Sequence, residues 1–225
     1  FRPLLVLLAA ETGDPHVEEV ITSACVVELT HLASLYHDDV MDEASLRRGA
    51  ESANARWDNL VAILTGDFLF SKSSELTARL GADAVKIQAE TFTRLVEGQI
   101  LETLGPGEED DPLDHYLRVV AGKTGSLIAT SARYGARFAG APLEVEEALT
   151  AYGEKIGSAF QLSDDIMDVT ASQLELGKEP GVDMKEGVYT LPVLHALSQG
   201  EDRDDLARLL AHGAPDGEML DRALE

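Results

Sequence analysis

The sequence predicts an all-α fold, a bundle of long helices that forms one domain. Apolar residues recur with helical spacing along most of the 225 residues, and the alternating pattern of strands is almost absent. Alanine and leucine are abundant and aromatic residues make up only 5% of the chain, which favours closely packed helices over a β-sandwich. A hydrophobic fraction of 44% supports one sizeable core, and the length does not require two.

Start and stop patterns along the chain define the expected elements. Asp14-Pro15 marks the start of the first long helix, and Gly81 marks the end of the second. Gly105-Pro106-Gly107 stops the third helix, and a break near residues 122–125 separates two shorter ones. The expected helices span residues 17–36 with a continuation through 42, then 53–80, 83–104, 113–121, 126–138, 143–169 and 190 onward.

Two segments differ from this helical pattern. Residues 170–189 mix Gly, Pro, Asp, Lys and Glu without a clear period, so we expect a loop there. A loop of this length in a compact helical protein is usually functional, often as a lid. Residues 200–225 read as the start of a helical pair that is cut short, and the chain begins abruptly without Met. We therefore expect residues 1–225 to be one domain truncated at both ends.

The formal net charge of −23 limits the classes of partner. So acidic a surface repels nucleic acid, and any phosphate site must supply its own cations as Lys, Arg or metal ions. The single cysteine, Cys25, excludes an intrachain disulfide and fits a reducing cytoplasm. The longest apolar runs, such as residues 3–10, are too short to span a bilayer, and the first residues lack the pattern of a signal peptide.

Two aspartate clusters carry the main chemical pattern. They are Asp38-Asp39-Val40-Met41-Asp42 and Asp164-Asp165-Ile166-Met167-Asp168, each at the end of a long apolar helical stretch. In a helix, the first and last aspartates of each cluster project from one face and repel each other. Mg²⁺ relieves this repulsion, and it also takes ligands from substrate phosphates. One cluster alone is explained as well by a solvated acidic face, whereas two matching clusters favour a metal site.

Residues near the clusters have the chemistry of a diphosphate site, although each also has an ordinary explanation. Arg47-Arg48 offers bidentate donors, or offsets surface charge. Lys123-Thr124 lies at the predicted helix break, where the lysine and a helix N-terminus would favour an anion. The alternative is an ordinary helix N-cap with a solvent-exposed lysine. Lys178 follows the second cluster in a loop, and Gln161 precedes it by one turn. His31 shares a helical face with the first cluster, as a ligand or as a core group.

Taken in order, these motifs resemble those of the trans-type polyprenyl (isoprenyl) diphosphate synthases over nearly the whole chain. The resemblance implies an isoprenoid-synthase-type helical bundle around a deep central cavity, and a homodimer. The matching segments are Arg2-Pro3-Leu4-Leu5, residues 31–49 with the first cluster and Arg47-Arg48-Gly49, Leu64-Thr65-Gly66-Asp67-Phe68-Leu69, Gly122-Lys123-Thr124, Phe160-Gln161-Leu162 with the second cluster, Gly177-Lys178, and Thr190-Leu191-Pro192.

The resemblance also implies a reaction. An allylic diphosphate, such as farnesyl or geranylgeranyl diphosphate, would condense head-to-tail with isopentenyl diphosphate. Three Mg²⁺ ions held by the two clusters would bind the allylic diphosphate and draw it away, leaving a carbocation. The double bond of isopentenyl diphosphate would attack this carbocation, and a proton would then leave, with the departing diphosphate as its acceptor. No nucleophilic side chain is required, and no catalytic triad is recognisable in the sequence.

Positions that match the family imply individual roles. Asp38, Asp42 and Asp164 would be direct metal ligands. Asp168 belongs to the same metal-binding set and, like Asp39 and Asp165, would act through water or by orienting the others. The implied substrate-binding residues are Arg47, Lys123, Lys178 and Gln161 for the allylic diphosphate, Arg2, His31 and Arg48 for isopentenyl diphosphate, and Lys123, Thr124 and Gln161 for catalytic stabilisation of the carbocation.

The sequence departs from the family pattern at two cationic positions. The family usually has a Gly-Gly-Lys segment just before the arginine matched by Arg2, and this chain does not contain it. Many members also have a lysine where this chain has Val188. The diphosphate site would then have one cation fewer, or would draw it from elsewhere.

The residues before the first cluster predict the length of the product. Ser34 and Ala33 lie four and five residues before Asp38, and both are small. Thr30 and Val27, about one turn and two turns earlier, are also modest in size. A growing prenyl tail would run past them, so we expect a product of about 30 carbons or more and a peripheral membrane contact for its release.

Three alternatives remain open. A short-chain synthase of the same family would make products of 15–20 carbons. A class I terpene cyclase shares the fold and the first cluster, but usually has a different second metal motif. A non-catalytic partner subunit of a heteromeric synthase would usually have degraded clusters, whereas both are intact here.

Overall fold

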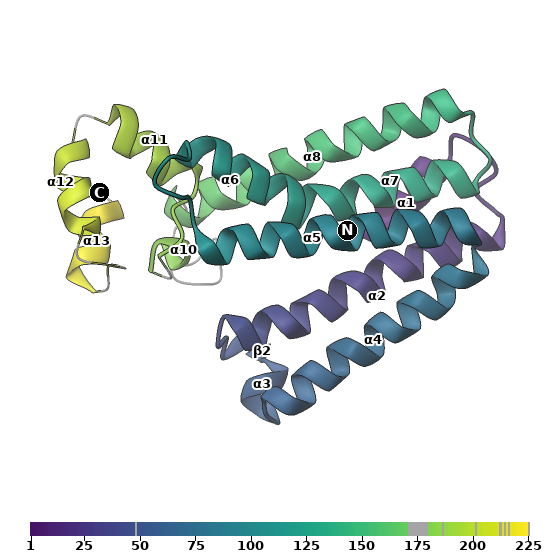
Figure 1. Ribbon diagram of the computed structural model, residues 1–225, viewed down its shortest axis with the longest axis horizontal. Helices are drawn as coiled ribbons and strands as arrows, with labels where there is room; N and C mark the ends of the chain where they lie inside the picture. Colours follow the sequence, from purple (N-terminus) through teal and green to yellow (C-terminus); the bar gives the residue numbers. More distant parts are fainter. Residues whose placement is uncertain are drawn as a thin grey trace. The chain divides into compact units, whose positions relative to one another are not determined.

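The computed structural model describes all residues except 48, 171–179, 186, 201, 212, 214, 216 and 225. Nearly all regular structure in the described residues is helical, which confirms the predicted all-α class (Figure 1). None of the described helices is long and apolar enough to cross a membrane. The described residues form two compact units, residues 1–95 with 124–157 and residues 96–123 with 158–225. The single domain expected from the sequence stays a prediction.

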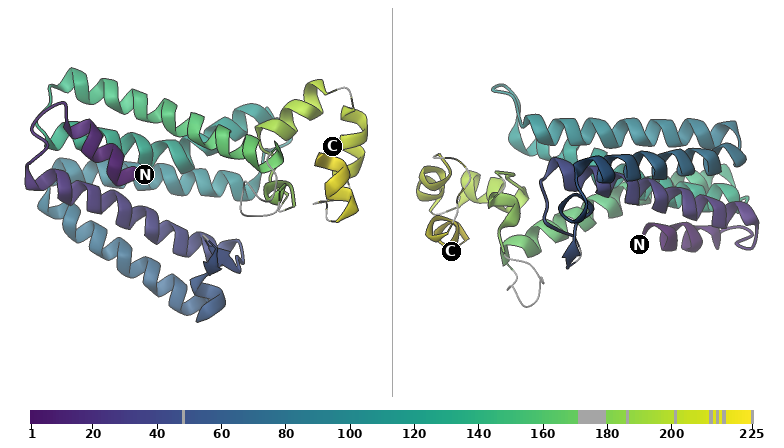
Figure 2. Two further views of the ribbon diagram at one scale, coloured as in Figure 1. Left: turned by 180° about the vertical axis from the view of Figure 1, so that it is seen from behind. Right: turned by 90° about the horizontal axis from the view of Figure 1, so that it is seen from below.

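The first unit is a set of packed long helices. Helix α1 (Arg2–Ala10) packs on α7 (Ser126–Phe138) and on α2 (Glu18–Met41). Helix α2 lies alongside α4 (Asn59–Arg79), and the same pairing is visible from behind and from below (Figures 1 and 2). Two long helices, α5 (Ala82–Leu104) and α8 (Leu143–Thr170), contribute residues to both units.

The core of the first unit is apolar and closely packed. Gly135 allows α1 to approach α7, because a Cβ there would lie 2.2 Å from the carbonyl oxygen of Val6. Tyr134 is fully buried, and its hydroxyl donates to the carbonyl oxygen of Ala84 at 2.8 Å. The buried core residues are Val6, Ala10, Val20, Ala24, Val26, Val27, Ile87, Leu95, Leu127, Tyr134 and Ala139.

The prediction of one helix over residues 53–80 is wrong. The structure has two helices, α3 (Ala53–Arg56) and α4, separated at Trp57 and Asp58. The carboxylate of Asp58 accepts from the N–H of Val61 at 2.8 Å and so satisfies a donor at the first turn of α4. The break therefore comes from a side-chain cap, which the apolar periodicity on either side does not reveal.

A two-stranded antiparallel ladder follows α2, although the sequence shows almost no strand pattern. Strand β1 (Leu46–Arg47) pairs with β2 (Ala50–Glu51), with Leu46 opposite Glu51 and Arg47 opposite Ala50. Gly49 turns the chain between them with a φ of 78°, a conformation that glycine adopts without strain. This ladder returns Arg47 towards the end of α2.

The second unit contains α6 (Pro112–Val120) and the short C-terminal helices. The carboxylate of Asp111 caps α6, accepting from the N–H groups of Leu113 and Asp114 at 2.9 Å. Part of the segment predicted as a loop, residues 170–189, is helical, and residues 171–179 lie outside the described part. The C-terminal helices are α10 (Val182–Lys185), α11 (Leu191–Gln199), α12 (Arg203–Leu210) and α13 (Glu218–Leu224), with a core of Met184, Val193, Leu210 and Leu220.

The predicted break near residues 122–125 is also wrong. A π-helical turn, η1 (Ala121–Gly125), joins α6 directly to α7. Lys123 therefore does not lie at a free helix N-terminus. Helix α5 passes close to this turn, since a Cβ at Gly98 would lie 2.6 Å from the backbone nitrogen of Lys123. Single π-helical turns inside helices often occur at functional sites.

Candidate functional site

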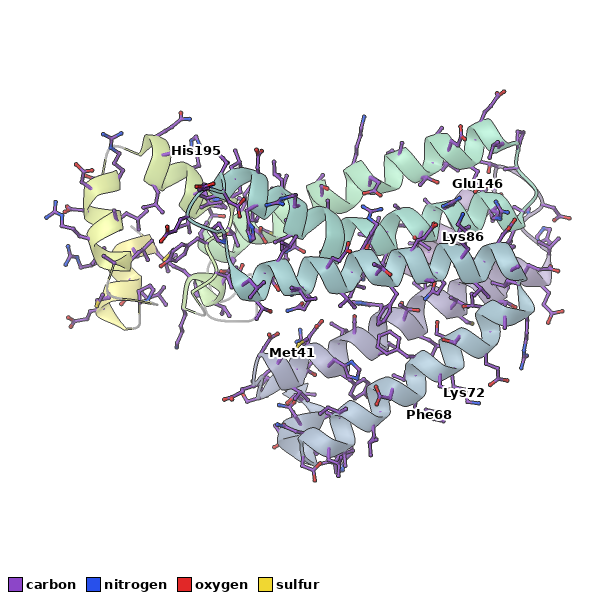
Figure 3. The ribbon with its side chains drawn as sticks, in the orientation of Figure 1. Met41, Phe68, Lys72, Lys86, Glu146 and His195 are labelled. Carbon is purple, nitrogen blue, oxygen red and sulfur yellow. The ribbon has the colours of Figure 1, made fainter. Side chains whose placement is uncertain are left out.

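The first aspartate cluster lies at the C-terminal end of α2. Met41, labelled in Figure 3, is the last residue of the helix, and Asp42 caps it. The N–H of Asp42 donates to the carbonyl oxygen of Asp38 at 2.8 Å, so helical geometry continues through the cluster. Asp42 is exposed and Asp38 is half-buried. The two carboxylates predicted to bind metal thus follow one another along the last turn of α2.

Asp39, the middle residue of this cluster, has a different environment. It is only 4% exposed, and its Oδ1 lies 2.6 Å from both Nε and Nη2 of Arg47. The β1–β2 ladder brings Arg47 to this carboxylate. Asp39 therefore holds the guanidinium of Arg47, whereas its expected action on the metal ligands stays a prediction. Arg48, the second predicted arginine, lies outside the described residues.

His37 adds a contact that was not predicted. Its Nε2 lies 3.2 Å from the carbonyl oxygen of Ile63 and 3.4 Å from a carboxylate oxygen of Asp67. The ring lies against the backbone of α4 at Gly66, where a Cβ would be 2.4 Å from Nε2. This contact joins the end of α2 to α4 next to Asp38. The Gly-Asp pair was visible in the sequence as part of a matching segment, but its partner was not.

The small residues before the first cluster are buried in the first unit. Ala33 is fully buried and Ser34 is 9% exposed. Thr30, also fully buried, shares a hydrogen bond of 2.8 Å with Ser73 of α4 and accepts one of 2.7 Å from Gln88 of α5. Small side chains thus occupy the positions predicted for the prenyl tail, and Thr30 contacts two neighbouring helices.

The second cluster, on α8, divides into exposed and buried carboxylates. Asp164 is exposed, whereas Asp165 and Asp168 are 3% and 2% exposed. Gln161 Nε2 donates to Asp165 Oδ1 at 2.8 Å, one helical turn away. Asp168 Oδ2 accepts from the backbone N–H of Asp183 at 3.3 Å. The carboxylate of Asp164 is thus accessible, whereas that of Asp168 holds the backbone at Asp183.

Tyr116 of α6 completes the environment of Asp165. Its hydroxyl donates to Asp165 Oδ2, and α6 also packs against α11. Burial raises the pKa of Asp165; the hydrogen bonds from Tyr116 and Gln161 oppose this rise, and the neighbouring carboxylate of Asp164 adds to it. Burial, the hydrogen bond and the charge of Asp165 raise the pKa of Tyr116, so its hydroxyl keeps its proton and remains a donor.

Lys123 pairs with a carboxylate that was not predicted. Its ammonium donates to Glu102 of α5, and both side chains are partly exposed. Glu102 follows Gly98 by four residues on α5, so both lie on the side of the helix that meets the π-helical turn. Thr124, the next residue of the turn, is 8% exposed. Lys178, the other predicted lysine, lies outside the described residues.

The predicted site residues fall into two groups. Arg2, His31 and Arg47 belong to the first unit, together with the first aspartate cluster. Lys123 and Gln161 belong to the second unit, together with the second cluster. Each cluster thus has cationic or amide donors within its own unit.

The donors of both clusters suit a hard cation, because all of them are carboxylate oxygens. Within the described residues, no three His, Cys, Asp or Glu side chains are gathered so that they could hold a metal ion. The carboxylates of the two clusters fit Mg²⁺, which binds through one or two carboxylates and completes its octahedron with waters and substrate phosphates.

Comparison with known proteins gives consistent matches. The family model for polyprenyl synthetase matches residues 1–225. A nonaprenyl diphosphate synthase of Mycobacterium tuberculosis is 52% identical over 212 residues, which are 94% of this chain and 63% of that protein. The chain therefore spans somewhat less than two thirds of the length of this relative.

Solved structures agree with this match. A geranylgeranyl pyrophosphate synthase of Corynebacterium glutamicum, complexed with calcium and isoprenyl diphosphate, is 47% identical with a TM-score of 0.84; the match covers 100% of this chain and 68% of that one. A polyprenyl synthase of Caulobacter crescentus CB15, with the same ligands, is 34% identical with a TM-score of 0.90; it covers 100% of this chain and 69% of that one.

Proposed function

This chain belongs to the polyprenyl synthetase family, and from that membership we propose that it is a Mg²⁺-dependent prenyltransferase. It would condense an allylic diphosphate head-to-tail with isopentenyl diphosphate to give a longer trans-polyprenyl diphosphate. The observation that carries this proposal is the family match over residues 1–225 in a chain that retains every aspartate of both clusters. A cyclase or a non-catalytic subunit would have less need for two intact clusters.

The proposed reaction begins with heterolysis of the bond between C1 of the allylic chain and the diphosphate oxygen. The electron pair leaves with the diphosphate, and C1 becomes an allylic carbocation. The double bond of isopentenyl diphosphate then forms the new carbon–carbon bond to C1. Loss of a proton from C2 of the isopentenyl unit restores a double bond, and the released diphosphate takes up the proton. When bound, Mg²⁺ supplies Lewis-acid stabilisation of the negative charge on the leaving diphosphate.

The protein would contribute binding, orientation and exclusion of water. Arg47 and Lys123 would donate to the allylic diphosphate, and their ion pairs with Asp39 and Glu102 support this role because they hold each cation in one orientation. Gln161 would turn its carbonyl oxygen towards the carbocation, since its amide nitrogen is bound to Asp165. The buried hydroxyl of Thr124 would face the same positive charge.

The remaining substrate ligands and the cofactor follow the family pattern. Asp38, Asp42 and Asp164 would bind three Mg²⁺ ions together with the substrate, with Asp168 assisting. Arg2, His31, Arg48 and Lys178 would complete the two diphosphate subsites. Cys25 as the sole cysteine supports a cytoplasmic location for this chemistry.

We propose a product of about 30 carbons or more, made from farnesyl or geranylgeranyl diphosphate. The small buried Ala33 and Ser34 support this length, because neither would block a tail that passes the end of α2. The relative that makes nonaprenyl diphosphate supports it as well. The similarity to a geranylgeranyl pyrophosphate synthase makes a product of 20 carbons the competing outcome.

Conservative changes in the clusters test the proposal. Replacing Asp38, Asp42 or Asp164 by Asn keeps the shape and removes one charged metal ligand. We expect each change to lower the rate of isopentenyl incorporation by at least about 100-fold, with normal folding. The exposed Asp221 on α13, changed to Asn, is the matched control and should leave the rate unchanged. Full activity in the Asp42→Asn and Asp164→Asn variants would rule out the proposed use of the clusters.

A further inference from the structure

Tyr116 is a buried hydroxyl for which the reaction scheme above has no role. Tyr116 is only 7% exposed, and its hydroxyl donates to Asp165, which lies 49 residues further along the chain. The helix that carries Tyr116, α6, also packs against α11. Tyr116 therefore connects α6 to the second aspartate cluster on α8, within one compact unit.

Asp165 is consequently held from two sides. Tyr116 donates to Oδ2, and Gln161 donates to Oδ1 at 2.8 Å. A buried carboxylate with both oxygens occupied by donors keeps one rotamer, because rotation would leave the charge buried without partners. Its position in turn fixes the amide group of Gln161, and with it the direction of the carbonyl oxygen of that residue.

We propose that Tyr116 is a positioning residue for the metal and diphosphate site, acting through Asp165. The inference rests on the proposed function, because it assumes that the second cluster binds metal. The role is needed because the three aspartates of the second cluster lie at one helix end and repel each other. A neutral donor fixed on the buried Asp165 disperses part of that charge into the protein and leaves the exposed Asp164 directed outward for the metal. Groups that hold a metal-site carboxylate in place typically change metal affinity about 10- to 100-fold when removed.

The chain offers a matched comparison in Tyr134. This tyrosine is also buried, with 0% exposure, and its hydroxyl donates to the carbonyl oxygen of Ala84 at 2.8 Å. Its partner is a backbone group of the first unit rather than a carboxylate of either cluster. Changing either tyrosine to Phe removes one buried hydroxyl and keeps the ring. A purely structural role for Tyr116 predicts equal consequences for the two variants.

The test uses Mn²⁺ with inorganic diphosphate as probes, so that it does not depend on turnover. Free Mn²⁺ is measured by electron paramagnetic resonance during titration of the wild type, Tyr116→Phe and Tyr134→Phe. We expect Tyr116→Phe to weaken Mn²⁺ binding about tenfold, and Tyr134→Phe to bind like the wild type. Both variants should lose a similar amount of thermal stability. Equal Mn²⁺ binding by the two variants would overturn the inference.

A double-mutant cycle with Asp165→Asn examines whether Tyr116 acts through this carboxylate. We expect Tyr116→Phe to have little further effect on Mn²⁺ binding once Asp165 is replaced, because coupled residues are not additive. If the fold-change in Mn²⁺ affinity of the double variant equals the product of the two single fold-changes, Tyr116 acts independently and the inference is wrong. Should Tyr116→Phe fail to fold, Asp165→Asn alone decides: Mn²⁺ binding equal to the wild type overturns the inference, and binding weakened about tenfold supports it.

The outcomes also separate this inference from the proposed function. A wild-type protein that binds no Mn²⁺ in the presence of diphosphate contradicts both. Wild-type binding that Tyr116→Phe leaves unchanged contradicts only the role of Tyr116.

Discussion

Ala33 shows how much a single residue decides in this molecule. It is fully buried on α2, and its carbonyl oxygen would lie 3.1 Å from a Cβ at Gly66, so α2 and α4 are close here. Two environments are compatible with the buried methyl group of Ala33. It lines the path of the prenyl tail, or it belongs to a solid core. The two situations predict different results for one substitution.

We predict that Ala33→Phe shortens the product. A phenyl ring in the tail path would stop elongation after fewer additions, and the products would be sized by chromatography and mass spectrometry. The control is Ala136→Phe on α7, which is also fully buried. Overpacking a core site costs about 1–3 kcal/mol of unfolding free energy, so the control should lose stability without changing product length. An unchanged product distribution in Ala33→Phe would exclude the predicted path.

At the residue scale, the sequence is informative about local patterns and not about distant partners. The aspartates of each cluster could be predicted because their spacing within one helix determines which face they share. The contact of Lys123 with Glu102 joins residues 21 apart, and that of Tyr116 with Asp165 joins residues 49 apart. Such pairs depend on how helices pack, and no local pattern identifies them.

The π-helical turn is the element that most changes the interpretation of the sequence. Glycines at 122 and 125 read as a helix break, yet the helical path continues through η1. Helix α5 lies against this turn, and its Gly98 approaches the backbone of Lys123. Likewise, the break before α4 comes from the cap at Asp58. Helix existence was therefore predictable from periodicity, whereas these boundaries depend on contacts between elements.

We predict that Gly98→Ala disturbs this turn. The added Cβ would lie 2.6 Å from the nitrogen of Lys123 and 3.0 Å from the carbonyl carbon of Gly122, so backbone must move. Unfolding free energy should fall by about 1–3 kcal/mol, and calorimetric titration should show weaker binding of inorganic diphosphate, because Lys123 is displaced.

The matched control for this prediction is Gly107→Ala. A Cβ there would meet only the exposed side chain of Asp110, whose carboxylate oxygen would lie 3.2 Å away. This change should alter unfolding free energy by no more than about 0.5 kcal/mol. Equal behaviour of the two alanine variants would refute the structural role given to Gly98.

At the scale of the whole molecule, we propose that two copies associate through α4. Leu60, Leu64 and Phe68 lie four residues apart along this helix and are 64%, 57% and 59% exposed. Figure 3 shows Phe68 on the side of α4 away from α2. A regular apolar stripe of this kind is typical of an association surface. The family resemblance of the sequence implies a homodimer, so a second copy is the proposed occupant.

We predict that Leu64→Glu converts the dimer to a monomer, as measured by sedimentation equilibrium. A charge buried at the centre of an apolar interface lacks a partner, which disfavours association. Ala151→Glu, at an exposed position of α8, adds the same charge outside the stripe and should remain dimeric. A wild-type protein that is monomeric, or a Leu64→Glu variant that stays dimeric, would refute this surface.

The all-α class followed from composition and periodicity alone, because both reflect the whole chain. The chemistry followed from two clusters whose spacing is local. The sequence could not predict which side chains hold the clusters in place. The guanidinium on Asp39 and the hydroxyl on Asp165 each come from another element.

The most direct test of the central claim is elongation by the purified wild-type protein. It is incubated with farnesyl diphosphate, labelled isopentenyl diphosphate and Mg²⁺, and the products are sized by chromatography. We predict linear polyprenyl diphosphates of about 30 carbons or more, and none when a chelator removes Mg²⁺. Absence of any elongated product with Mg²⁺ present, or a cyclic hydrocarbon formed from farnesyl diphosphate alone, would contradict the proposed function.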